Sequence, residues 1–211
     1  MERSNRKVII HVKLGGVKMI NYEFRLNDEE FKVCKDFSVS SAKSQREYRS
    51  GGSQFRSIGM IESDTLRGKV GEFIVKKFLQ QSPFNINGIK LDFNVYERGV
   101  WDEKDFNVGS LNFSVKSAKW FSRWLLLESK DINRGDVYDV YVFVTIEKDF
   151  KSGTIKGFTT KDEVLNGPNT LELNRGDYIP NTNTTLDAAN HAIHSDHLHN
   201  SADDWKELLI N

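Results

Sequence analysis

The residues best suited to chemistry lie in two short strand-like stretches, residues 105–108 and 111–117, joined by a Gly-Ser turn. The first stretch opens with Asp105, and the second carries Lys116 near its end. Side chains alternate between the two faces of a strand, so Lys116 shares a face with Ser114. If the stretches pair as a hairpin, the carboxylate of Asp105 comes close to Lys116.

A carboxylate beside a lysine suits the hydrolysis of a phosphodiester. A Mg²⁺ ion held by carboxylates neutralises the charge that develops on phosphorus and makes a bound water nucleophilic. Because Mg²⁺ keeps several of its waters, one or two carboxylates and the phosphate itself complete its coordination. A lysine beside the metal positions or activates the attacking water or holds the phosphate. Asp105 and Lys116 are therefore candidate catalytic residues; the alternative is a turn aspartate and a surface lysine.

A further carboxylate, Glu72, lies on a predicted helix that begins at the N-cap Asp64 and runs to about Gln81. The principal apolar stripe of this helix consists of Leu66, Val70, Phe73 and Ile74. Glu72 belongs to a second face, with Gly68, Val75 and Leu79. With such neighbours, we expect Glu72 to line a cleft or to be paired with a cation.

The order of three short segments resembles the PD-(D/E)XK nuclease superfamily. The segments are Gly71-Glu72 on a helix, then Asp105-Phe106, then Ser114-Val115-Lys116-Ser117. That superfamily includes most type II restriction endonucleases. The resemblance covers residues 62–211 loosely and has motifs only within residues 68–117. It implies a restriction endonuclease-like α/β fold, in which a mixed sheet is flanked by helices.

The resemblance implies roles for three residues. Asp105 matches the metal-binding aspartate, Lys116 the catalytic lysine, and Glu72 the helix glutamate that completes the metal site. Two positions depart from the family pattern, because Ser114 replaces an acid and Lys104 replaces a proline. The nearest spare carboxylates belong to Asp102 and Glu103, with Glu97 next.

The activity implied by the resemblance is Mg²⁺-dependent, sequence-specific cleavage of double-stranded DNA by a homodimer, with a companion DNA methyltransferase in the same system. A second hypothesis is a DNA-binding relative that does not cleave, or one of a repair or phage type, in which Ser114 marks an incomplete metal site. A third is an α/β interaction protein that does not bind nucleic acid.

Residues 38–59 are rich in Ser, Gly, Arg and Lys and are predicted to form a long loop or arm. Basic residues mixed with aromatic ones suit contact with DNA phosphates or guanine edges. The alternative is an ordinary surface loop. The candidate DNA-binding residues are Lys43, Arg46, Arg49 and Arg56 in the arm, and Lys119 beyond it.

Other residue types that often carry chemistry are interpreted as structural. The four histidines between residues 191 and 199 lack a nearby cysteine or carboxylate cluster, so we expect surface or helix-end positions rather than a zinc site. Cys34 is expected to behave as a small apolar residue. Core positions are predicted for Trp120, Trp124 and Trp205.

The remaining elements follow from periodicity. Residues 7–14 and 17–24 alternate around Gly15-Gly16 and predict a β-hairpin, and residues 137–147 are apolar enough for a central buried strand. A short helix is expected before the arm, and further strands and helices follow the predicted helix that carries Glu72. The expected strands are residues 89–96, 124–128 and 154–158, and the expected helices residues 27–36, 160–165 and 203–210.

Composition sets the class of protein. A length of 211 residues suits a single domain. Within it, we expect an N-terminal hairpin and basic arm over residues 1–60 and a catalytic core over residues 61–211. Basic residues outnumber acidic ones up to residue 130, and acidic residues dominate afterwards, although the net charge is zero. A single cysteine excludes an internal disulfide. No apolar run is long enough to cross a membrane, so we expect a cytoplasmic protein.

Overall fold

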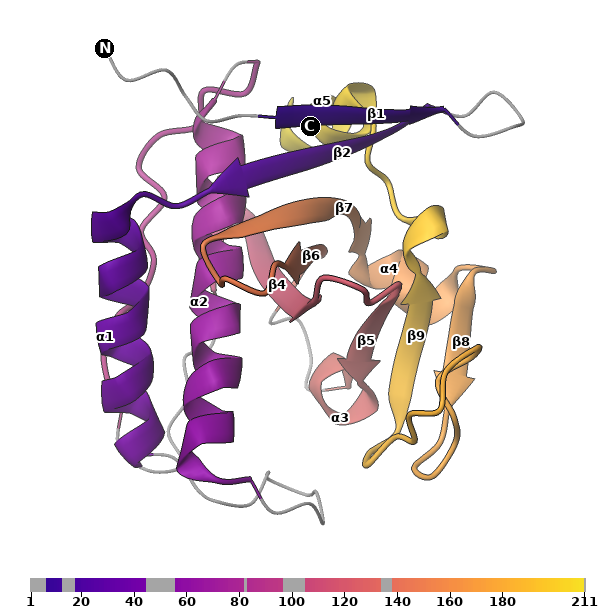
Figure 1. The fold of residues 1–211 in the computed structure, drawn as a ribbon. Coiled ribbons are helices and arrows are strands. Elements are labelled where there is room, and N and C mark those ends of the chain that lie inside the picture. Colours follow the sequence, from indigo (N-terminus) through magenta and orange to yellow (C-terminus); the bar gives the residue numbers. More distant parts are fainter. Residues whose placement is uncertain are drawn as a thin grey trace.

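The structure, a computed structural model, describes residues 7–12, 18–44, 56–81, 83–96, 105–133 and 138–210 (Figure 1). It is a mixed α/β arrangement, with a curled six-stranded sheet, a smaller three-stranded sheet and flanking helices. The strands are β1 (Lys7–Val12), β2 (Lys18–Arg25), β3 (Phe106–Val108), β4 (Leu111–Lys119), β5 (Trp124–Glu128), β6 (Val140–Ile146), β7 (Ser152–Thr160), β8 (Thr170–Leu173) and β9 (Asn190–His194). The helices are α1 (Asp28–Ser44), α2 (Ile58–Gln80), α3 (Ser129–Ile132), α4 (Lys161–Asn166), the 3-10 turn η1 (Ser195–His197) and α5 (Ala202–Ile210).

The large sheet has the strand order β1-β2-β7-β6-β4-β3. Every residue of β6 is buried, which confirms the predicted central strand. The N-terminal hairpin is also confirmed, since β1 and β2 pair antiparallel. β2 also pairs antiparallel with β7, with Tyr22 opposite Ile155. The hairpin therefore extends the same sheet that carries β4.

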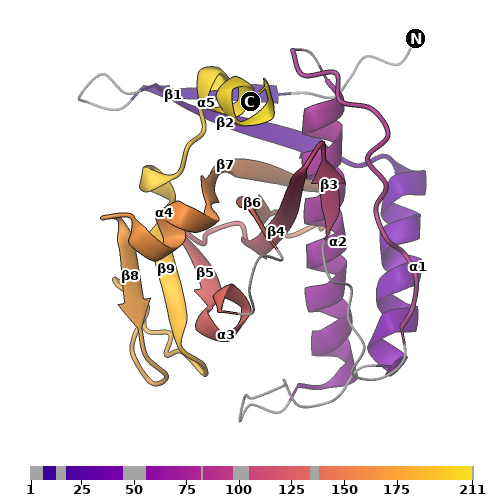
Figure 2. The same ribbon diagram turned by 180° about the vertical axis from the view of Figure 1, so that it is seen from behind.

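α1 and α2 lie side by side along one flank of the large sheet (Figures 1 and 2). Both are longer than predicted. α2 begins after the N-cap Ser57, whose hydroxyl accepts a hydrogen bond from the backbone N–H of Met60. The expectation that Asp64 starts this helix is therefore wrong: Asp64 lies inside α2 and forms ion pairs with Arg56 and Arg67.

α1 continues through residues 38–44, which were expected to belong to a loop. Serine favours loops because its hydroxyl competes for backbone hydrogen bonds. Here the Ser38 hydroxyl donates to the carbonyl of Lys35, and Ser44 donates to Ser41, so the helix itself satisfies them. The small buried side chains of Ser38 and Ser41 let α1 pack closely.

β4 separates two hydrophobic clusters. Val115 and Phe113 face α2, where they join a core that includes Val70, Ile74 and Phe78. The opposite face of the large sheet, with Tyr141 and Phe143, contributes to a second cluster with residues of β5, β9 and α4. Side chains that alternate along β4 therefore point into different surroundings.

The smaller sheet has the order β5-β9-β8 and stands apart from α1 and α2 in both views. β8 and β9 were not predicted as strands. His191 and His194 lie in β9, where positions three apart face opposite ways. His194 is also the N-cap of η1, and its ring accepts a hydrogen bond from the backbone N–H of Asp196.

A capping box begins α4, in which the Thr160 hydroxyl accepts from the backbone N–H of Glu163 and Glu163 accepts from that of Thr160. The Glu163 carboxylate also lies 2.6 Å from Nε2 of His199. Burial opposes ionisation of Glu163, but its hydrogen bonds with Thr160 and His199 outweigh this effect, so its pKa is lowered.

Three further predictions meet different outcomes. Trp205 of α5 is fully buried against Phe78 and Phe158, which confirms its core position. Trp120 is instead 45% exposed, so the expectation of a core residue is wrong. Residues 89–96 form no strand, although Ile89 is buried. In the described part of the chain, no helix has the length and apolar character to cross a bilayer.

Candidate active site

The β3–β4 hairpin positions Asp105. Gly109 makes the turn with a φ of +59°, a conformation that glycine adopts without steric cost. Phe106 lies opposite Phe113, and their rings stack at 5.4 Å on the side of the α2 core. Asp105 precedes β3, and its Oδ2 accepts a hydrogen bond from the backbone N–H of Val115 at 2.5 Å. The carboxylate is thus held at the edge of β4, beside the residue that precedes Lys116.

The pairing register of β3 and β4 determines which residues lie beside Asp105. Because Phe106 pairs with Phe113, the next step along the hairpin sets the position of Asp105 opposite Ser114. Directly opposed residues of an antiparallel pair share a face, so this position lies on the Ser114–Lys116 face of β4. Ser114 is almost completely buried. The structure therefore places the Asp105 carboxylate at the Val115 N–H, on the strand that also carries Ser114 and Lys116.

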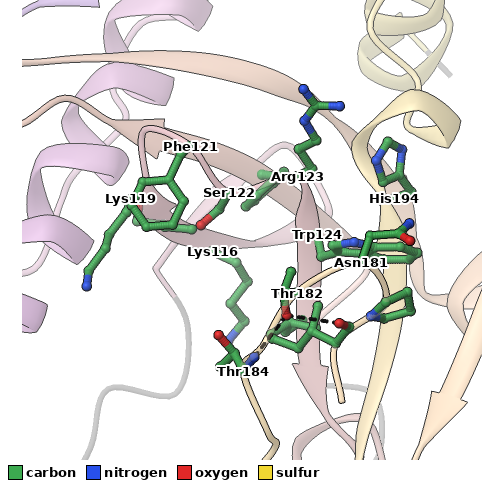
Figure 3. A pocket seen from close by; sticks show the side chains of 16 residues that line it. Lys116, Lys119, Phe121, Ser122, Arg123, Trp124, Asn181, Thr182, Thr184 and His194 are labelled. Carbon is green, nitrogen blue, oxygen red and sulfur yellow. Dashed lines mark hydrogen bonds between the residues drawn. The ribbon is translucent and has the colours of Figure 1, made fainter.

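Lys116 projects into a pocket of about 760 Å³ between the two sheets (Figure 3). Its side chain extends toward Thr184, and Nζ lies 5.8 Å from the centroid of the Tyr138 ring. Lys119 and Arg123 supply two more cations to the lining. Within the part of the chain that the structure describes, no aspartate or glutamate lines this pocket.

The far wall of the pocket comes from the β8–β9 connection and from β9. There the Thr182 hydroxyl donates to the carbonyl of Ile179 and accepts from the backbone N–H of Thr184. Trp124 of β5 lies opposite His194 of β9 in register, with the ring centroids 5.0 Å apart. These polar and aromatic groups, together with the cations, fit an anionic ligand with a flat portion, as in a nucleotide.

Lys156 lies close enough to Arg123, a pocket residue, for the two charges to influence each other. Burial lowers the pKa of the Lys156 amine, nearby Glu147 opposes that shift, and the positive charge of Arg123 adds to it.

Glu72 lies on the other side of β4. A Cβ added at the neighbouring Gly71 would be 1.9 Å from Ser117 Oγ, so α2 packs directly on the Val115–Ser117 face. Glu72 is only 5% exposed, and its carboxylate forms an ion pair with Lys69 at 2.8 Å. It is also close to Cys34: burial raises the pKa of that thiol to about 12, and the Glu72 charge contributes. The sheet thus separates Glu72 from the pocket that Lys116 lines.

The candidate DNA-binding residues have different surroundings. Lys119 lies at the pocket, as noted above, and Lys43 is exposed near the end of α1. Arg56 pairs with Asp64 at 2.6 Å. Arg46 and Arg49 lie outside the described residues, as do the spare carboxylates of Glu97, Asp102 and Glu103.

The described residues fit a Mg²⁺ site only in part. One carboxylate oxygen of Asp105 accepts the Val115 N–H, which fixes this acid beside the strand that carries Lys116. Within the described ranges, no group of three or more His, Cys, Asp or Glu side chains is placed to hold a metal ion. Sequence reasoning missed Arg123, Trp124 and His194 as pocket residues, because only strand pairing between β5 and β9 brings them together.

The chain matches no known protein-family model and no curated protein.

Proposed function

We propose that the protein is a Mg²⁺-dependent endonuclease that cleaves phosphodiester bonds of double-stranded DNA. One observation carries the proposal: Lys116 enters a pocket lined by further cations, while the Asp105 carboxylate is anchored to the backbone of the adjacent residue. A lysine, a nearby carboxylate and additional cations are the groups that phosphodiester hydrolysis requires.

Each residue has a proposed part. Lys116 holds the scissile phosphate or orients the attacking water, and Lys119 and Arg123 hold neighbouring phosphates. The Asp105 carboxylate would bind Mg²⁺, which would supply Lewis acidity and a more acidic bound water. Ser114 adds a hydroxyl but no charge, so a further carboxylate must come from elsewhere in the chain.

The resemblance would make Glu72 a second metal-binding acid beside Asp105, but the sheet separates Glu72 from the pocket that Lys116 lines. Its carboxylate neutralises Lys69 beneath α1, with both side chains buried. A Glu72→Gln variant separates the two roles, because loss of a metal ligand reduces cleavage while folding persists, whereas loss of the ion pair reduces stability.

In the full proposal the enzyme is of the type II restriction class, acts as a homodimer on a symmetric site, and has a companion DNA methyltransferase. The second candidate function is DNA binding without cleavage. The position of Ser114 and the absence of acids from the described pocket lining favour it.

The experiment incubates the protein with phage DNA and Mg²⁺, with EDTA as the blank. Discrete fragments support restriction activity, random degradation supports a repair or phage nuclease, and retarded but intact DNA supports the second candidate. Lys116→Ala and Asp105→Asn should each slow cleavage by about a hundredfold or more. Lys32→Ala is the matched control, because Lys32 is an exposed lysine of α1 paired with Asp36. Undiminished cleavage by Lys116→Ala would refute the proposed site.

A further inference from the structure

The turn between β4 and β5 exposes two aromatic rings. Trp120 is 45% exposed and Phe121 is 60% exposed. Their ring centroids are 5.4 Å apart, with the planes nearly perpendicular, so the rings support each other edge to face. The backbone N–H of Ser122 donates to the carbonyl of Lys119 at 2.8 Å and closes the turn. The pair is therefore presented on a short, hydrogen-bonded turn.

Positive charge surrounds these rings. Lys148, from the turn between β6 and β7, places its Nζ 5.2 Å from the centroid of the Trp120 ring. Lys119 precedes the pair and Arg123 follows it, and both line the pocket that Lys116 enters. Figure 3 shows Phe121 and Lys119 on the opposite side of that pocket from His194. The turn thus adjoins the proposed cleavage site.

Exposed aromatic rings flanked by cations fit two kinds of surface, nucleic acid and anionic lipid. Here the flanking cations continue into a pocket with hydroxyl, amide and aromatic groups. Such groups suit phosphates and bases, whereas a lipid surface requires a broad apolar face. Proteins that distort duplex DNA insert apolar side chains between base steps, and aromatic rings stack on unpaired bases.

We infer that the Trp120–Phe121 turn is a wedge that stacks against an unstacked base of the bound DNA while Lys148 and Arg123 hold the adjacent phosphates. This inference rests on the proposed function, since it takes DNA as the ligand. It adds that the enzyme distorts its substrate next to the scissile phosphate.

The test measures binding in EDTA, so that cleavage does not interfere. The probe is a short duplex with an internal 2-aminopurine, alone or next to a single-base bulge. Wild-type protein should increase 2-aminopurine fluorescence and prefer the bulged duplex. Trp120→Ala or Phe121→Ala should weaken binding roughly five- to a hundredfold, as expected for loss of one base–aromatic stack. In the same two variants, the increase in 2-aminopurine fluorescence should be lost together with the binding affinity.

Two matched variants make the result specific. Leu165→Ala removes a side chain of α4 with the same 45% exposure as Trp120 and should leave DNA affinity unchanged. Lys148→Ala should reduce the dependence of binding on salt by about one unit of slope, whereas Trp120→Ala should leave that slope unchanged.

The outcomes distinguish this inference from the proposed function. Cleavage by wild-type protein, with full DNA affinity retained by both aromatic variants, would overturn the wedge and leave the nuclease. Base unstacking without cleavage under any metal would support the wedge and reject the nuclease. Binding to anionic phospholipid vesicles with a blue shift of tryptophan emission, and no binding to DNA, would overturn both.

Discussion

The packing of α2 on β4 leads to a prediction in which two glycines of one helix behave oppositely. A Cβ at Gly68 would meet nothing within 4 Å, whereas a Cβ at Gly71 would lie 1.9 Å from Ser117 Oγ and 3.2 Å from Ser117 Cβ. Glycine inside a helix is about 1 kcal/mol less favourable than alanine. Gly68→Ala should therefore stabilise the protein by up to about 1 kcal/mol.

Gly71→Ala gains the same helix propensity but forces α2 and β4 apart. Overpacking of this kind costs about 1–3 kcal/mol, so the net effect should be a loss of up to about 2 kcal/mol. The hydroxyl responsible has no hydrogen-bond partner among the described residues, so its removal sacrifices little. In a Ser117→Ala background, Gly71→Ala should cost less or become neutral, with a coupling of about 1–2 kcal/mol.

Urea unfolding, followed by circular dichroism for the wild type and these variants, measures each free energy of unfolding. The slope of the transition should stay constant, since the surface exposed on unfolding hardly changes. If Gly71→Ala stabilises as much as Gly68→Ala, or if its effect is the same with and without Ser117→Ala, the close approach of α2 to β4 is wrong.

Three further predictions concern ionisable groups. Lys69→Met removes the cation that lies 2.8 Å from the buried Glu72 carboxylate and should reduce the free energy of unfolding by about 3–5 kcal/mol in urea titration, and a loss below about 1 kcal/mol would contradict a buried pair. Because the pKa of Glu163 is lowered in the folded protein, its ionised form stabilises the fold fully above the ordinary carboxyl pKa of about 4.3, and this stabilisation is lost as the pH falls through the lower folded value. Glu163→Gln should therefore flatten the acid side of a plot of melting temperature against pH. An unchanged acid side would count against the contact with His199. Because burial raises the pKa of Cys34 to about 12, its thiol should react with a disulfide reagent only on unfolding, and rapid labelling of native protein would show that α1 opens.

Local patterns predicted the elements whose signals are local. The β3–β4 hairpin follows from strand alternation around Gly109, and β6 follows from its continuous apolar run. The hairpin accounts for the proximity of Asp105 to the strand that carries Lys116. The orientation of Glu72 could not be obtained in this way, because it depends on how α1 and residues near Phe93 pack around Lys69.

Long-range pairing explains most of the remaining differences. The pocket wall formed by residues 179–184 reaches Lys116 only through the pairing of β9 with β5. Serine hydroxyls that bond within their own helix turned an expected loop into the second half of α1. Trp120 looked like a core residue by type, yet a tight turn after β4 places it outside.

The pairing of β2 with β7 has a consequence for how the chain acquires its shape during synthesis. A strand near residue 22 cannot meet its neighbour near residue 155 until most of the polypeptide has left the ribosome. Trp205 adds a still later contact, closing over Phe78 and Phe158. Such distant contacts slow folding and expose unpaired strand edges meanwhile. A fragment that starts at residue 61 would leave an edge of β7 bare, and we expect it to aggregate rather than to form an independent catalytic unit.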